Sequence, residues 1–195
     1  TDPVKWAMIK CTKLPDDISE ELKLTLLGSV HLVGQTPWSA FEKACYIYRM
    51  KEKSRRPIDA MANDMGLNVA EAKLYAKVYE TMMNADDLKQ TKWSYYFEVF
   101  KNRSIVKVDE EYPNLNVIDT IVEKIKHDEF EEAKDVRKVG DIAKSKNEDA
   151  IMILTEYLED ELPLDDAHEL VSEVNRAQSI SKGFKKFQKL ITDNI

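Results

Sequence analysis

The stretch Pro57-Ile-Asp-Ala-Met-Ala-Asn-Asp-Met-Gly-Leu-Asn-Val-Ala-Glu-Ala-Lys-Leu-Tyr-Ala-Lys-Val78 has the pattern of a helix-turn-helix motif. Pro57 suits the first turn of a helix, and Gly66 lies where that helix has to end in a left-handed turn. Asn68 can cap the next helix. The inward faces are Ile58, Met61, Ala62 and Met65 in the first helix and Val69, Ala72, Tyr75, Ala76 and Tyr79 in the second. Such a motif can present its second helix to DNA.

A basic run before the motif favours DNA binding over the alternative, an ordinary helical hairpin. Basic side chains just before the N-terminus of the first helix suit phosphate contact, although a solvated loop would have the same composition. The exposed face of the second helix would meet the base edges in the major groove. The candidate DNA-binding residues are Lys51, Lys53, Arg55, Arg56, Asn68, Ala70, Lys73 and Lys77.

The net charge of −7 is sorted along the chain, which reconciles it with DNA binding. Residues 37–108 carry a net charge of +4, and residues 109–169 carry −13. Binding responds to the local field within about 8 Å at physiological salt, so the first half can bind phosphate and the acidic half should face away from it. A hydrophobic content of 43%, with five glycines, excludes a disordered or collagen-like chain. Two cysteines make no disulfide framework, which indicates the cytoplasm.

The periodicity predicts a mainly α-helical fold, in which a helix-turn-helix domain precedes a helical bundle and one short strand covers Val4–Cys11. Because a lone strand needs a partner and the chain begins at Thr1 without Met, we expect a missing front half that pairs with it. The stretch 102–116 breaks the helical pattern and divides a DNA-binding domain, 1–108, from an acidic helical domain, 109–195. Helices are expected at 17–29, 37–52, 57–65, 69–84, 86–101, 116–127, 131–145, 147–159 and 164–191.

Residues 22–79 resemble the central DNA-binding region of ParB-type partition proteins. In that family a leucine-rich helix precedes a helix with an acidic residue and an alanine near its start, and the helix-turn-helix follows. The matching residues here are Leu22, Leu24, Leu26 and Leu27 for the first helix, and Glu42 and Ala44 for the second. The resemblance implies sequence-specific binding to centromere-like or operator DNA by a homodimer, in a protein carried by a plasmid or phage. It also brings a partner ATPase into consideration.

Two motifs of that family are missing, so the chain resembles a divergent member. The arginine-containing box Glu-Asn-x-Gln-Arg is replaced by Ser29-Val-His-Leu-Val-Gly-Gln35, and the Gly-Glu-Arg-Arg motif that contacts nucleotide phosphates is absent. Nucleotide binding is therefore not carried over, and no cofactor is expected for this chain. An enzyme would come into question only with a nucleotide-binding domain before Thr1.

The remaining candidate residues are better explained by structural roles than by catalysis or ligand binding. The three histidines are scattered without ligand spacing, so we expect neither a metal site nor catalytic residues. Four aromatic residues at helical spacing are expected to form a buried spine rather than a platform for single-stranded bases: Trp93, Tyr96, Phe97 and Phe100. In the last helix an apolar stripe runs beside lysines. We expect the lysines to lie near acids such as Glu159, Asp160 and Glu161, and burial of the apolar side chains to hold the helix in place. That stripe holds Phe184, Phe187, Leu190 and Ile191, beside Lys182, Lys185, Lys186 and Lys189.

The sequence thus predicts a sequence-specific, double-stranded-DNA-binding protein of ParB-like partition or transcription-regulatory type. It would be cytoplasmic, associated with the nucleoid or a plasmid, and without a membrane-spanning segment. The alternative is a helical protein-interaction module whose helix-turn-helix no longer binds DNA. Both stay open because the second helix is only mildly basic, with Lys73 and Lys77 set against Glu71.

Overall fold

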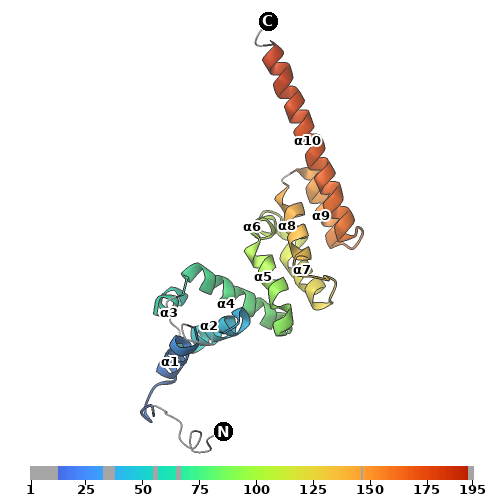
Figure 1. The fold of residues 1–195 in the computed structure, drawn as a ribbon. Coiled ribbons are helices and arrows are strands. Elements are labelled where there is room, and N and C mark those ends of the chain that lie inside the picture. The colour runs from blue at the N-terminus through green and yellow to red at the C-terminus, as the bar shows by residue number, and fades with distance from the viewer. Residues whose placement is uncertain (1–12, 33–37, 55–56, 65–66, 146, 193–195) are drawn as a thin grey trace, which may run out of the picture. The chain divides into compact units, whose positions relative to one another are not determined.

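The computed structural model describes residues 13–32, 38–54, 57–64, 67–145 and 147–192, which are helical almost throughout (Figure 1). The predicted mainly α-helical fold is confirmed, and the predicted strand at Val4–Cys11 lies outside the described residues. The α-helices are α1 (Glu20–Leu32), α2 (Ala40–Ser54), α3 (Ile58–Asp64), α4 (Val69–Asn84), α5 (Trp93–Lys101), α6 (Arg103–Glu111), α7 (Val117–Lys126), α8 (Asp135–Lys144), α9 (Glu148–Leu158) and α10 (Leu164–Thr192). In the part of the chain that the structure describes, the short 3-10 helices η2 (Gln90–Lys92) and η3 (Pro113–Leu115) precede α5 and α7.

Several helices begin later than the sequence predicts, and for α2 and α5 the local reason is clear. α2 begins after a reciprocal cap, in which the backbone N–H of Ser39 donates to Glu42 Oε2 over 2.8 Å and that of Glu42 donates to Ser39 Oγ over 3.3 Å. α5 begins at Trp93 rather than at residue 86, because Asp86 has a φ of 54° and turns the chain away from the helical path.

The expected break at residues 102–116 is wrong, because α6 occupies most of it. Ile105 and Val108 are buried on the inner face of this helix, while the acidic triplet at its end faces largely outward. Asp109 also has a role in the fold, since its Oδ1 accepts the backbone N–H of Ile118 at the start of α7 over 3.0 Å. The acidic stretch is therefore a helix end with a capping residue.

The chain divides into two compact units, residues 1–72 and 73–195, and the division falls inside α4. The boundary expected after residue 108 lies within α6, which packs against α7 and α8. Because α5 also packs on α7 and α8, helices from both sides of that position contribute to the second unit.

In the first unit, α1 and α2 pack against each other around Tyr46. The hydroxyl of Tyr46 donates to the carbonyl oxygen of Leu24, and its ring centroid lies 5.2 Å from that of Trp38. Gly28 makes room for the tyrosine, since a Cβ at this position would lie 2.5 Å from the hydroxyl oxygen. Burial raises the pKa of Tyr46 above its ordinary value.

In the second unit, α8 is the central helix and contacts α5, α6, α9 and α10. Its apolar residues Val136, Val139 and Ile142 are completely buried. Gly140 allows the start of α6 to come close, because a Cβ there would lie 1.7 Å from the side-chain amide nitrogen of Asn102. Asn102 is the N-cap residue of α6, so one glycine fixes where that helix begins against α8.

The last helix does not dock as the sequence predicts. Phe184 is 62% exposed, and the acidic residue Asp160 forms its ion pair with Lys124 rather than with a lysine of α10. α10 has 29 residues whereas α8 has ten and α9 has eleven, so only its first turns find neighbours to pack on. The expected burial of the apolar stripe is therefore wrong at Phe184.

Lys92 is a buried lysine that ties η2 to the end of α7. Its ammonium group donates to the carbonyl oxygens of Ile125 and Lys126 over 2.8 and 2.9 Å, and lies 2.8 Å from Asp128 and 3.5 Å from Asp87. These carbonyls lie in the last turn of α7, at the negative end of the helix dipole, and that of Ile125 also accepts the backbone N–H of Asp128 over 3.2 Å. Burial favours a lower pKa for Lys92, but the carboxylates of Asp128 and Asp87 outweigh it and raise the pKa.

Replacing Lys92 with Met should lower the free energy of unfolding by about 3 kcal/mol, because the carbonyls of Ile125 and Lys126 lose the ammonium donor and the buried carboxylate of Asp87 loses its nearer cation. Urea denaturation checks this. The control Lys126→Met removes an exposed lysine and should cost under about 0.5 kcal/mol. Adding Asp87→Asn to Lys92→Met should recover part of the loss, and simple additivity would contradict a coupled pair.

Candidate nucleic-acid interface

The turn between α3 and α4 keeps the features that the sequence predicts. Met61 and Ala62 of α3 are buried, at 1% and 0% exposure. Just after α3, the backbone N–H of Leu67 donates to the carbonyl oxygen of Ala62 over 2.8 Å, which returns the chain toward the helix it has left. The predicted turn glycine, Gly66, lies outside the described residues. The described part of the turn is tight and built on a buried alanine.

Asn68 caps α4 as predicted. Its Oδ1 accepts the backbone N–H of Ala70 over 2.9 Å and that of Glu71 over 3.4 Å, while its carbonyl accepts the N–H of Ala72 over 2.9 Å. The cap uses the amide oxygen and leaves the amide nitrogen to other contacts. Asn68 therefore fixes the start of α4, and this role does not depend on any contact with another molecule.

The exposed face of α4 carries three of the predicted site residues. Ala70, Lys73 and Lys77 are exposed and fall three and four residues apart, which places them along one side of the helix. The other side is buried, at Ala72, Tyr75, Ala76 and Tyr79, as predicted from the periodicity. α4 is therefore amphipathic, with a small residue and two cations outward.

Lys77 also has a contact that the sequence does not predict. Its ammonium nitrogen lies 4.8 Å from the centroid of the Phe100 ring, and Lys101 lies 5.6 Å from that of Phe97. The predicted aromatic spine is buried at Trp93 and at Tyr96, but only half-buried at the two phenylalanines. A lysine ammonium group lies over each of these two rings. The solvent-exposed part of the aromatic cluster, at Phe97 and Phe100, therefore belongs to the same surface as Lys77.

The basic run upstream of α3 is described only in part. Lys51 is half-buried and Lys53 is exposed, both in the last turn of α2, where cations are favoured by the helix dipole. Arg55 and Arg56 lie outside the described residues. The acidic Glu52 is exposed between the two lysines. The end of α2 thus carries the positive charge that the sequence predicts.

Within the second unit, many cations are occupied by acidic side chains. Lys124 pairs with Asp160 and with Glu129, at 3.1 Å from the latter. Hydrogen bonds to Asp165 and then to Asp135, at 2.7 and 3.0 Å, raise the pKa of Lys138 to about 12. These lysines hold helices together and are not available to an outside anion.

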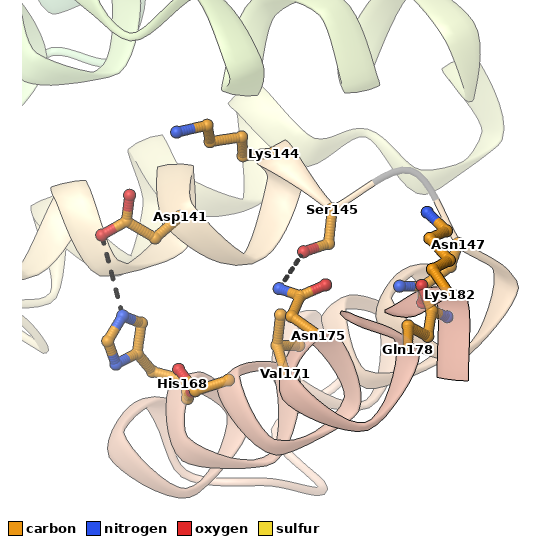
Figure 2. A pocket seen from close by; sticks show the side chains of 10 residues that line it. Asp141, Lys144, Ser145, Asn147, His168, Val171, Asn175, Gln178 and Lys182 are labelled. Carbon is orange, nitrogen blue, oxygen red and sulfur yellow. Dashed lines mark hydrogen bonds and ion pairs between the residues drawn. The ribbon is translucent and has the colours of Figure 1, made fainter. Parts of the chain in front are cut away.

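A polar hollow of about 780 Å³ lies between α8 and α10 (Figure 2). In it His168 Nε2 lies 3.7 Å from Asp141 Oδ2, and the side-chain amide of Asn175 donates to Ser145 Oγ over 2.6 Å. The first pair joins α10 to α8, and the second joins α10 to Ser145 directly after α8. Lys182, further along α10, also lines the hollow. The sequence could not indicate this hollow, because its residues are spread over more than thirty positions without a recognisable spacing.

The described part of the chain contains no group of three His, Cys, Asp or Glu residues that could hold a metal ion. Over the same residues, no helix is long and apolar enough to cross a membrane. No protein-family model, curated protein or solved structure matches the chain. The similarity to ParB-type proteins therefore rests on the residues alone.

We expect Asn68→Ala to destabilise the start of α4 by about 1 kcal/mol, because the N–H groups of Ala70 and Glu71 lose their acceptor. Hydrogen exchange at these two amides should speed up while exchange in α8 stays unchanged. Asn114→Ala, an exposed asparagine of η3, serves as the control and should change stability by less than about 0.5 kcal/mol. Equal effects of the two changes would contradict a capping role.

Proposed function

We propose that this protein binds double-stranded DNA sequence-specifically, as a ParB-like partition or transcription-regulatory factor, with α4 as its recognition helix. One observation carries the proposal: α4 is capped at Asn68, directly after the tight turn from α3, and presents Ala70, Lys73 and Lys77 on one exposed side. A helix that begins at a fixed point and carries cations outward suits insertion into the major groove.

The exposed residues of α4 would have different roles. Ala70, near the N-terminal end, is small enough to let the backbone approach and can contact a thymine methyl group. Lys73, one turn on, can reach the acceptors of a guanine. Lys77 first has to leave the Phe100 ring, so it is the better candidate for a phosphate at the edge of the groove. Asn68 can add a contact through its amide nitrogen while its oxygen keeps the cap.

The end of α2 would supply contacts to the sugar-phosphate backbone. Lys51 and Lys53 are described, and Arg55 and Arg56 belong to the same proposed run on sequence grounds. Such contacts carry little sequence information but set affinity and its dependence on salt. The acidic segment, 109–169, would stay away from the duplex and remain free for protein partners, including an ATPase of the kind that the ParB resemblance brings into consideration.

Lys73→Ala should weaken binding to a cognate site more than to random DNA, by about 1–3 kcal/mol of discrimination, because a base contact is lost. The cognate site is first selected from a random DNA library with the full chain, and both affinities are then measured at one salt concentration. Lys134→Ala, which removes an exposed lysine outside α4, serves as the control. Equal weakening on both DNAs would move Lys73 to the phosphates.

The library experiment also separates the proposal from its alternative. If no sequence is enriched and the affinity for DNA is the same for the wild-type chain and Lys73→Ala, the helix-turn-helix does not read DNA. The protein-interaction module is then the better interpretation.

The double change Lys51→Ala and Lys53→Ala should flatten the plot of log K against log salt by about 1.8, from about 0.9 per phosphate contact, while sequence preference is kept. Fluorescence anisotropy across a salt series measures this slope. Lys126→Ala with Lys134→Ala removes two exposed lysines of the second unit and should leave the slope unchanged. A slope that changes equally in both double variants would mean that only net charge matters.

A further inference from the structure

α10 is far longer than the helices it packs against. Its 29 residues span about 44 Å, and its first turns bury Ala167 and Val171 against α8 and α9. From residue 175 to residue 186 almost every residue is exposed, and the helix runs on beyond its neighbours in the second unit (Figure 1). About half of the helix therefore has no neighbour within the described chain.

The outer side of α10 is apolar at the spacing of a helix-pairing seam. Leu170 is 40% exposed, Ile180 is 67% exposed and Phe184 is 62% exposed. Together with Ala177, the last two follow the alternation of three and four residues that two paired helices require. Large apolar side chains at this exposure, in register along one helix, mark a surface that another molecule covers.

A lone helical extension of this kind is poorly stabilised by itself. Helices of about 12–15 residues are marginal in water without packing. Gly183 weakens this one further, by about 1 kcal/mol relative to alanine. A Cβ at Gly183 would meet nothing within 4 Å, so packing within the described chain does not require the glycine. The extension needs a covering partner for its stability.

The charge distribution along α10 identifies that partner. Residues 164–175 carry a net charge of −4, and residues 176–192 carry +5. Two such helices side by side in parallel would set like charges against each other along their whole length. In the antiparallel orientation, the basic half of each helix meets the acidic half of the other.

We propose that α10 pairs with α10 of a second copy of this chain, antiparallel and across a two-fold axis. Ala177 of each copy lies at the axis, and Leu170 of each copy packs against Phe184 of the other, which sets residues 164–175 of one helix beside residues 179–190 of its partner. The same surface patch is used on both copies, so the assembly closes at two chains. This inference does not rest on DNA binding.

Light scattering on the full chain should give about twice the chain mass of 22.6 kDa. Ile180→Asp with Phe184→Asp should shift the species to one chain mass, and circular dichroism should show a loss of helix no larger than the extension, because both side chains are exposed and no other helix depends on them. Met152→Asp is the control, since Met152 is 57% exposed but lies on α9. A wild-type monomer at tens of micromolar, or a dimer that survives the double change, would overturn the proposal.

The orientation is tested with spin labels on the full chain, in which Cys11 and Cys45 are replaced by Ser. A label at Glu169→Cys should give an inter-chain distance of about 25 Å, because antiparallel pairing about residue 177 separates the two positions by about 16 residues of helix rise. A label at Ser179→Cys, close to the axis, should give a much shorter distance. Short distances at both positions would mean parallel helices and would overturn the antiparallel arrangement.

Discussion

Lys92 enters the interior just before α5 and ends among two carbonyl oxygens of α7 and the carboxylates of Asp128 and Asp87. The hydroxyl of Tyr96, a completely buried residue, donates to the same Asp87 over 3.2 Å. One ammonium group thus ends a helix, neutralises a buried acid and fixes a core tyrosine. α5 and α7 are held at this point, and α8 packs against α5 next to them. The helices that carry the acidic surface depend on this buried charge.

Local sequence signals placed most helices of this fold, and the errors have physical causes. Asn68 and Asn147 have clear capping positions, and α4 and α9 begin next to them. The acidic triplet around Asp109 suggested a loop, because its capping contact with Ile118 joins residues nine positions apart. Lys92 gave no signal either, since a lysine that bonds carbonyls 33 and 34 residues away looks like any surface lysine.

The candidate interface was predictable where it follows helix periodicity and unpredictable where it depends on the fold. Ala70 and Lys73 lie on the exposed side of α4, as their spacing requires. The Phe100 ring under Lys77 comes from a separate helix, and nothing in the spacing of either residue pairs them. Phe184 shows the opposite case: its apolar stripe was evident, but the stripe could not tell whether the chain's own helices reach far enough to cover it.

In the proposed complex with DNA, the position of Lys77 over Phe100 would affect selectivity. A cation over an aromatic ring near the surface is stabilised by about 0.5–1 kcal/mol, so Lys77 already has a favourable contact with the half-buried ring of Phe100 within its own chain. A DNA group that binds Lys77 must interact with it more favourably than the Phe100 ring does. Random sequences that interact with Lys77 less favourably would leave it over the Phe100 ring, so the complex would have one contact fewer. The contact with the Phe100 ring would then compete with DNA for Lys77 and lower the affinity for sites that offer this lysine only a weak contact.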